Sequence, residues 1–183
     1  RAYVFVHDDV AERLVLTAET QGGGALSRSD TIVVSPEVPG KPITFASIYP
    51  GTITADGASI STITTQPIRD TYGNVVAPGT LIRVTPSRGS VQSEDQDPTT
   101  PTTVERRTES AGVVSVFIRS GTSPGVSSVL FQSLVGTASG TATITFAPPP
   151  ACAYGGYLAP RNLAPTGSVQ FRCSVANTST TPV

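Results

Sequence analysis

The sequence contains no methionine, no tryptophan, a single histidine and two cysteines in 183 residues. Cys152 and Cys173 stand 21 positions apart with no histidine near them, which is a poor arrangement for a metal site. No apolar run approaches the roughly 20 residues that a membrane-spanning helix requires, so no direct membrane insertion is predicted. The two cysteines are expected to form either a disulfide in an oxidising compartment or a pair of free buried thiols.

Charged residues are also scarce. They make up 14% of the chain, whereas an average soluble domain carries roughly 25%. The formal net charge is −1, and a nucleic-acid-binding domain would carry a basic face, so no nucleic-acid partner is predicted. Low charge together with many Thr, Val and Ser residues favours β-strands, because β-branched side chains fit a pleated surface.

Short apolar or alternating runs recur between turn sequences such as "DTYGN", "APG" and "SGTSPG". This spacing without helical periodicity predicts an all-β sandwich, and "DDVAERL" is too short to stand as an isolated helix. The expected strands are Tyr3–His7, Arg13–Ala18, Thr31–Ser35, Thr44–Tyr49, Ser59–Thr65, Leu81–Thr85, Val113–Arg119, Ser127–Gln132, Thr141–Phe146 and Val169–Val175.

Alternation within these runs predicts which side chains share a face. Within each of three runs, the apolar residues are expected to point to the same face of the strand. The three sets are Ile82 and Val84; Val114, Val116 and Ile118; and Ala142, Ile144 and Phe146. Ile60 and Ile63 are three positions apart and break the pattern, which predicts a bulge or kink there. Pro67 predicts that this part of the strand lies at a sheet edge or bulge.

The chain also contains a weak internal repeat. "VFV" at 4–6 resembles "VFI" at 116–118, and "IVV" at 32–34 resembles "ITF" at 144–146, both 112 positions apart. Pro-rich stretches lie at 35–42 and 147–151. The expected organisation is the last strands of one domain over 1–38, a complete domain over 39–147 and the first strands of another over 148–183. The absence of an initiator Met and a signal peptide also suits a fragment of a longer array.

The middle unit resembles a known family. Its residues "TADGASISTITTQPIRDTYGNVVAPGTLIRV", "ESAGVVSVFIRSGTSPG" and "ASGTATITF" are similar to the bacterial Ig-like domain of group one, the repeat of invasin- and intimin-type adhesins. The resemblance implies tandem Ig-like β-sandwich domains, one complete and two partial, that serve as stalks, spacers or ligand platforms. The polar stretch 86–108 is long for its place in this pattern.

Two turn sequences are the strongest local motifs. Asp70 is expected to accept backbone N–H groups while Gly73 or Asn74 adopts positive φ, and Asp56 with Gly57 is expected to form a hairpin-type turn. A Ca²⁺ site needs several more oxygen ligands than these stretches supply. No cofactor and no metal ion are therefore predicted.

Chemistry elsewhere is sparse. His7 beside Asp8 and Asp9 could suggest a general base, but a catalytic triad also needs a positioned nucleophile, which no motif indicates. We therefore expect no enzymatic activity. Loops on a rigid sandwich favour binding, so candidate partner contacts are Glu94, Asp95, Asp97, Arg106 and Arg107 in the polar stretch, and Tyr154 and Tyr157 beside the second Pro-rich stretch.

The expected function is structural or adhesive. The chain is predicted to be part of an extracellular or cell-surface bacterial protein whose repeats form a stalk or fibre. Its partners would be other proteins or neighbouring copies of the same chain. Two alternatives remain open at this point. The domains could be spacers in a secreted enzyme or envelope complex, or the chain could assemble head to tail into a strand-complemented filament.

Overall fold

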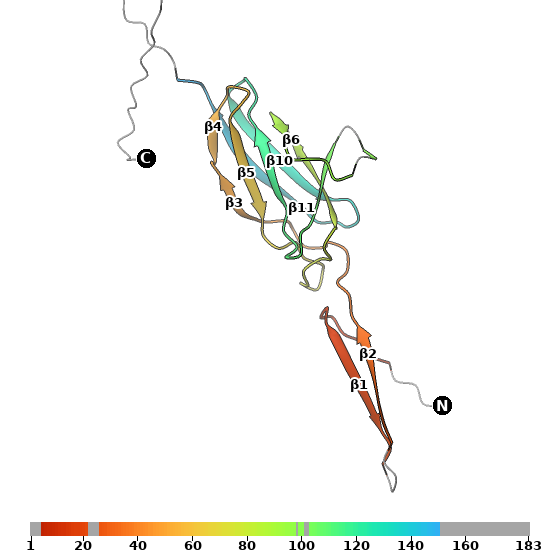
Figure 1. Ribbon diagram of the computed structural model, residues 1–183. Coiled ribbons are helices and arrows are strands. Elements are labelled where there is room, and N and C mark those ends of the chain that lie inside the picture. The colour runs from red at the N-terminus through yellow and green to blue at the C-terminus, as the bar shows by residue number, and fades with distance from the viewer. Residues whose placement is uncertain (1–4, 22–25, 98, 101–102, 151–183) are drawn as a thin grey trace, which may run out of the picture.

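The computed structural model describes residues 5–21, 26–97, 99–100 and 103–150. Within these residues all regular structure is β, and no helix is long and apolar enough to cross a membrane. The strands form a two-stranded hairpin and a sandwich of two sheets (Figure 1). The hairpin consists of β1 (Arg13–Glu19) and β2 (Ser27–Val33), and it projects from one end of the sandwich.

The sandwich is built from a five-stranded and a four-stranded sheet. The first has the order β4-β11-β10-β6-β8, with β11 parallel to β4 and the other pairs antiparallel, and the second has the order β3-β5-β9-β7, antiparallel throughout. The strand bounds are β3 (Phe45–Tyr49), β4 (Thr52–Thr54), β5 (Ile60–Thr65), β6 (Leu81–Pro86), β7 (Ser90–Val91), β8 (Val104–Arg107), β9 (Ser115–Arg119), β10 (Gly125–Ser133) and β11 (Ser139–Ala147).

Alternating apolar side chains from both sheets meet in one core. All the sets expected to share a face point inward, and Ile82, Val116 and Ile144 are fully buried. Phe131 of β10 lies at the centre, where its ring meets Phe45 edge to face with centroids 5.1 Å apart. This arrangement confirms the predicted all-β sandwich.

The bulge predicted at Ile60 and Ile63 is wrong. Strand β5 pairs with β9 in an unbroken register, with Ile63 fully buried and Ile60 47% exposed on the opposite face. The regular pleat places Ser61 beside Ile63 on the inner face, where its hydroxyl donates to the Pro50 carbonyl at 2.7 Å. The bulge lies instead in the neighbouring strand, between Phe45 and Ser47. Pro67 lies beyond the end of β5, outside the ladder.

Several predicted strand bounds also need correction. Residues 5–7 form no strand, so the described part of Tyr3–His7 departs from the prediction, and Val169–Val175 lies outside the described residues. Three short strands, β4, β7 and β8, were not predicted. The last two lie within the polar stretch 86–108, because pairing to β9 and β6 makes strands of residues that are too few or too polar to show a pattern.

The hairpin and the last hairpin of the sandwich have corresponding positions in the chain. Strands β1 and β10 begin at Arg13 and Gly125, and β2 and β11 begin at Ser27 and Ser139, 112 positions apart in both cases. The register differs by one residue, because Leu14 pairs with Ile32 whereas Val126 pairs with Thr145. Of the two sequence matches, 32–34 with 144–146 lies at the end of β2 and in β11, whereas residues 5–7 form no strand and 116–118 lie in β9. Only part of the internal repeat therefore corresponds to a repeated antiparallel hairpin.

Candidate functional site

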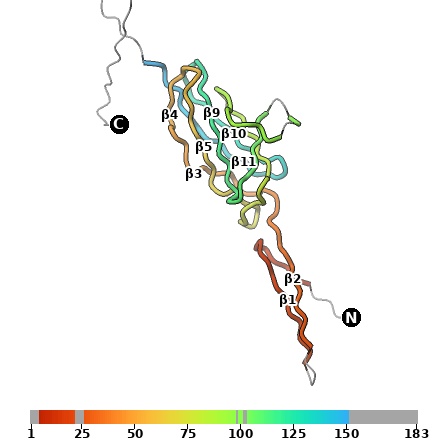
Figure 2. Tube along the Cα trace, viewed as in Figure 1, coloured from red at the N-terminus to blue at the C-terminus, as the bar shows by residue number. Residues whose placement is uncertain are grey.

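The most elaborate polar structure lies where the segment after the hairpin meets the sandwich. Figure 2 shows the chain running from β2 through this segment into the sandwich. Pro39 is buried there, and its carbonyl oxygen accepts the Thr137 N–H at 3.1 Å. The Gly40 and Lys41 N–H groups donate to the Arg69 carbonyl at 3.1 and 3.2 Å. Glycine is needed at position 40, because a Cβ would collide with the Thr71 side chain and backbone.

Asp70 organises the turn that receives this segment. Its side chain is fully buried, and Oδ1 accepts the N–H groups of Gly73 and Asn74, both at 2.8 Å. Gly73 has φ +100°, so the positive φ of this turn falls on glycine and not on Asn74. Burial acts to raise the pKa of Asp70, but hydrogen bonds from Asn74, Glu37 and Gly73 outweigh it and hold that pKa below its ordinary value.

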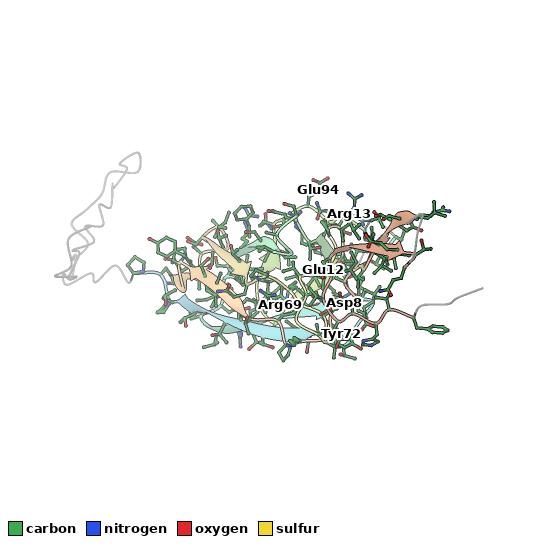
Figure 3. The ribbon with its side chains drawn as sticks, turned by 90° about the horizontal axis from the view of Figure 1, so that it is seen from below. Asp8, Glu12, Arg13, Arg69, Tyr72 and Glu94 are labelled. Atoms are coloured by element: carbon green, nitrogen blue, oxygen red, sulfur yellow. The ribbon has the colours of Figure 1, made fainter. Side chains whose placement is uncertain are left out.

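Asn74 connects the same turn to the segment that precedes the hairpin. Its Oδ1 accepts the Ala11 N–H at 3.0 Å, and its Nδ2 donates to the Asp9 carbonyl at 2.8 Å and to Asp70 Oδ2 at 3.0 Å. Asp70 Oδ2 also accepts the Glu37 N–H at 3.1 Å. Figure 3 shows Tyr72 of this turn, and Arg69 just before it, close to Asp8 and Glu12 in the view from below. We call Asp70 to Asn74 the junction turn.

The second predicted turn lies elsewhere on the sandwich, and it is not the expected hairpin-type turn, because it joins β4 and β5, which belong to different sheets. Asp56 Oδ1 accepts the N–H groups of Ala58 and Ser59 at 2.8 and 2.7 Å, and Gly57 has φ +72°. Asp56 is exposed, and the hydrogen bonds from Ser59 and Ala58 hold its pKa well below the ordinary value. Its hydroxyl partners are Ser59 and Ser120, so the turn closes on β5 and the end of β9.

A buried carboxylate that the sequence reasoning did not single out lies in the polar stretch. Glu105 on β8 is fully buried and accepts the Arg83 Nε–H at 2.8 Å and the hydroxyls of Thr100 and Thr103, both at 2.6 Å. Burial acts to raise the pKa of Glu105, but the threonine hydroxyls and Arg83 outweigh it and lower that pKa. In the sequence, Glu105 stands between Val104 and Arg106, and nothing local indicates that it is buried.

An open groove of about 280 Å³ runs where the edges of the two sheets approach each other, and it is lined by Val84, Thr85, Pro86, Ser90, Val91, Thr103 and Val104. None of these side chains titrates near neutral pH. Across the described part of the chain, no three His, Cys, Asp or Glu residues gather as metal ligands would. The arrangement of these sites can therefore connect and stiffen β units.

Solved structures of other proteins identify the kind of sandwich. The crystal structure of invasin, a bacterial integrin-binding protein, matches 77% of this chain with a TM-score of 0.50 and 24% sequence identity. The sandwich is Ig-like. The adhesin InvE of Yersinia pseudotuberculosis matches 59% of the chain at 22% identity and a TM-score of 0.43. A family 2 glycosyl hydrolase of Bacteroides cellulosilyticus matches 74% at 22% identity and a TM-score of 0.46.

The chain spans 26% of invasin, 27% of InvE and 17% of the hydrolase, so each likeness concerns only part of a longer protein. At these identities they establish the fold alone. No family model and no curated protein matches the chain.

The Ig-like sandwich uses several of the predicted contact residues internally. Asp95 Oδ1 accepts the N–H groups of Asp97 and Glu105, both at 3.0 Å, and Arg106 Nη1 donates to the Glu94 carbonyl at 3.0 Å. Glu94 and Arg107 are both exposed residues, but Arg107 Nη1 donates to the Gly79 carbonyl at 3.3 Å, so Glu94 is the member of the set most available to a partner. Their role as contacts stays a prediction.

The remaining predicted residues are either exposed or outside the description. His7 Nε2 lies 3.7 Å from Asp9 Oδ1, with side chains 87% and 56% exposed, which is the opposite of the buried geometry that a catalytic triad uses. Four residues, Cys152, Tyr154, Tyr157 and Cys173, lie outside the described residues, so the disulfide and the aromatic contacts stay predictions.

Proposed function

We propose that this chain is a structural or adhesive segment of an extracellular bacterial surface protein. Its sandwich would be a group-one bacterial Ig-like domain of the invasin and intimin type, acting with neighbouring units as a stalk or fibre. The observation that carries the proposal is the end-to-end arrangement of the described chain. The hairpin is attached at one end of the Ig-like sandwich, and the chain leaves β11 at the opposite end (Figure 1).

The hairpin supports an organisation in consecutive units. An isolated two-stranded hairpin is marginally stable in water, and Val15 and Val33 on one face of this hairpin are 63% and 68% exposed. Its strands begin 112 positions before those of the last hairpin of the sandwich. In the proposed array, residues 1–38 are the closing strands of a preceding Ig-like unit, 39–147 are a complete unit, and 148–183 begin the next.

The mechanism of such a segment is mechanical. Each sandwich has a closed hydrogen-bonded core, and proline fixes φ in the connecting segment at Pro36, Pro39 and Pro42. The length of the array then scales with the number of units. Partners are proteins or other copies of the chain, bound by exposed loops such as the one carrying Glu94, and the segment has no catalytic role.

Localisation on cells tests this function. Antibodies raised against the purified chain should label intact, unpermeabilised cells of the source organism, and brief protease treatment of those cells should remove the label. Immunogold particles should lie at a constant distance from the outer surface, as a stalk of fixed length requires. Label confined to a secreted fraction that also carries glycosidase activity would show instead that the domains are spacers in a secreted enzyme.

A further inference from the structure

We infer that the junction turn is a rigid two-point joint, which fixes the hairpin-bearing unit in one orientation relative to the Ig-like sandwich. The inference deepens the proposed stalk function and rests on it for its biological use. Two units joined by one flexible segment rotate freely, so their length as a stalk is poorly defined. A second, independent attachment removes that rotation.

The two attachments come from the segments on either side of the hairpin in the sequence, one before β1 and one after β2. Glu37, which follows β2, donates its N–H to Asp70 Oδ2 at 3.1 Å. Ala11, which precedes β1, donates its N–H to Asn74 Oδ1 at 3.0 Å. Both strands of the hairpin are therefore held near the ends that face the sandwich. The chain alone requires only the attachment after β2, whereas the attachment before β1 depends on a side chain.

Asn74 uses all of its hydrogen-bonding groups in this joint. A neutral amide has one acceptor oxygen and two N–H donors. Oδ1 accepts from Ala11, and Nδ2 donates to the Asp9 carbonyl at 2.8 Å and to Asp70 Oδ2 at 3.0 Å. An aspartate at this position would lose both donors and would place a second carboxylate against Asp70. The asparagine is thus specific for joining the N-terminal segment to the Asp70 carboxylate.

The joint is firm on the sandwich side as well. Ile68 and Val76, on either side of the junction turn, are each 2% exposed in the core. The Val76 N–H donates to the Ile68 carbonyl at 3.1 Å, and the Ile68 N–H donates to the Gly112 carbonyl at 2.9 Å. A Cβ at position 112 would collide with the Val75 side chain, so Gly112 packs closely against the residue that follows the turn. Movement of the turn would therefore disturb the core.

Residual dipolar couplings measured on the full chain test the joint directly. In the unmodified protein, amides of β1 and β2 and amides of the sandwich should fit one alignment tensor. In Asn74→Asp and Asn74→Ala, the sandwich amides should keep their tensor and chemical shifts, while the hairpin amides need a separate and weaker one. Tyr72→Ala is the matched control, because Tyr72 is an exposed residue of the same turn, and it should behave as the unmodified protein.

Hydrogen exchange at Ala11 supplies a second readout that needs no assumption about variant folding. Ala11 lies outside the strands, so protection of its N–H reports the bond to Asn74. Its exchange should be slowed by about tenfold in the unmodified protein, as expected for one ordinary hydrogen bond. Separate tensors or unprotected Ala11 in the unmodified protein would overturn the joint. Cell-surface labelling is independent of both results, so failure of the joint and failure of the stalk function can be told apart.

Discussion

Removal of Arg83 should expose how strongly the buried Glu105 depends on its cation. Arg83 Nε donates to Glu105 Oε1 at 2.8 Å, and Glu105 is fully buried while the Arg83 side chain is 33% exposed. Arg83→Met leaves a buried carboxylate supported only by the hydroxyls of Thr100 and Thr103. Breaking a buried pair in this way costs about 3–5 kcal/mol, and we expect about 3 kcal/mol because water reaches the arginine.

The double variant Arg83→Met with Glu105→Leu separates the cost of leaving Glu105 unpaired from the net contribution of the ion pair to stability. Replacing both partners by apolar groups of similar volume is often close to neutral, so the double variant should be more stable than Arg83→Met alone. Glu105→Gln keeps one acceptor oxygen and should lose about 2 kcal/mol, the scale of a hydrogen bond to a charged group. Two exposed residues, Arg119 and Glu109, provide matched controls. The unfolding free energies of Arg119→Met and Glu109→Gln should each stay within about 0.5 kcal/mol of the unmodified protein.

Urea unfolding of the full chain, followed by circular dichroism, gives these free energies of unfolding. The comparison requires that the slope of unfolding free energy against urea concentration be the same in all variants. The order of stability among the variants is a stricter test than any single free energy. If Arg83→Met were as stable as the double variant, the carboxylate would not need its cation, and the account of a charged, buried Glu105 would be wrong.

Two further predictions concern acid and the contact at Pro39. The folded-state pKa values of Asp70 and Glu105 lie below their ordinary values of 3.8 and 4.5. The stability that these two carboxylates contribute is therefore present above those ordinary values and is lost as the pH falls below them. Urea unfolding midpoints measured from pH 7 to pH 3 should decrease below those values, and midpoints that do not change with pH would contradict the shifts. Gly136→Ala places a Cβ against the Pro39 carbonyl and should cost about 1–3 kcal/mol by overpacking. Gly51→Ala, whose Cβ would meet only the Ile48 carbonyl at an ordinary contact distance of 3.9 Å, should be nearly neutral in thermal unfolding.

Much of the fold could be predicted because the relevant information is local. Strand β11 buries Ala142, Ile144 and Phe146 in alternation, and that period is visible in the sequence. Ile60 shows the limit of the argument, since an exposed isoleucine at the start of β5 was read as a break in the pattern. Strands β4, β7 and β8 have two to four residues each, too few to show any period.

By itself, the sequence determined the all-β class, the inward faces of β6, β9 and β11 and the residues able to make tight turns. These properties follow from β-branched composition, a period of two and the conformational freedom of glycine. Only the tertiary structure decided that Asn74 bonds to Ala11 and Asp9, which lie 63 and 65 positions away. It also decided that Glu105 is buried, because the Arg83 cation comes from another strand and lies 22 positions earlier. Local sequence patterns do not indicate which distant polar group will form a hydrogen bond or ion pair with a given side chain.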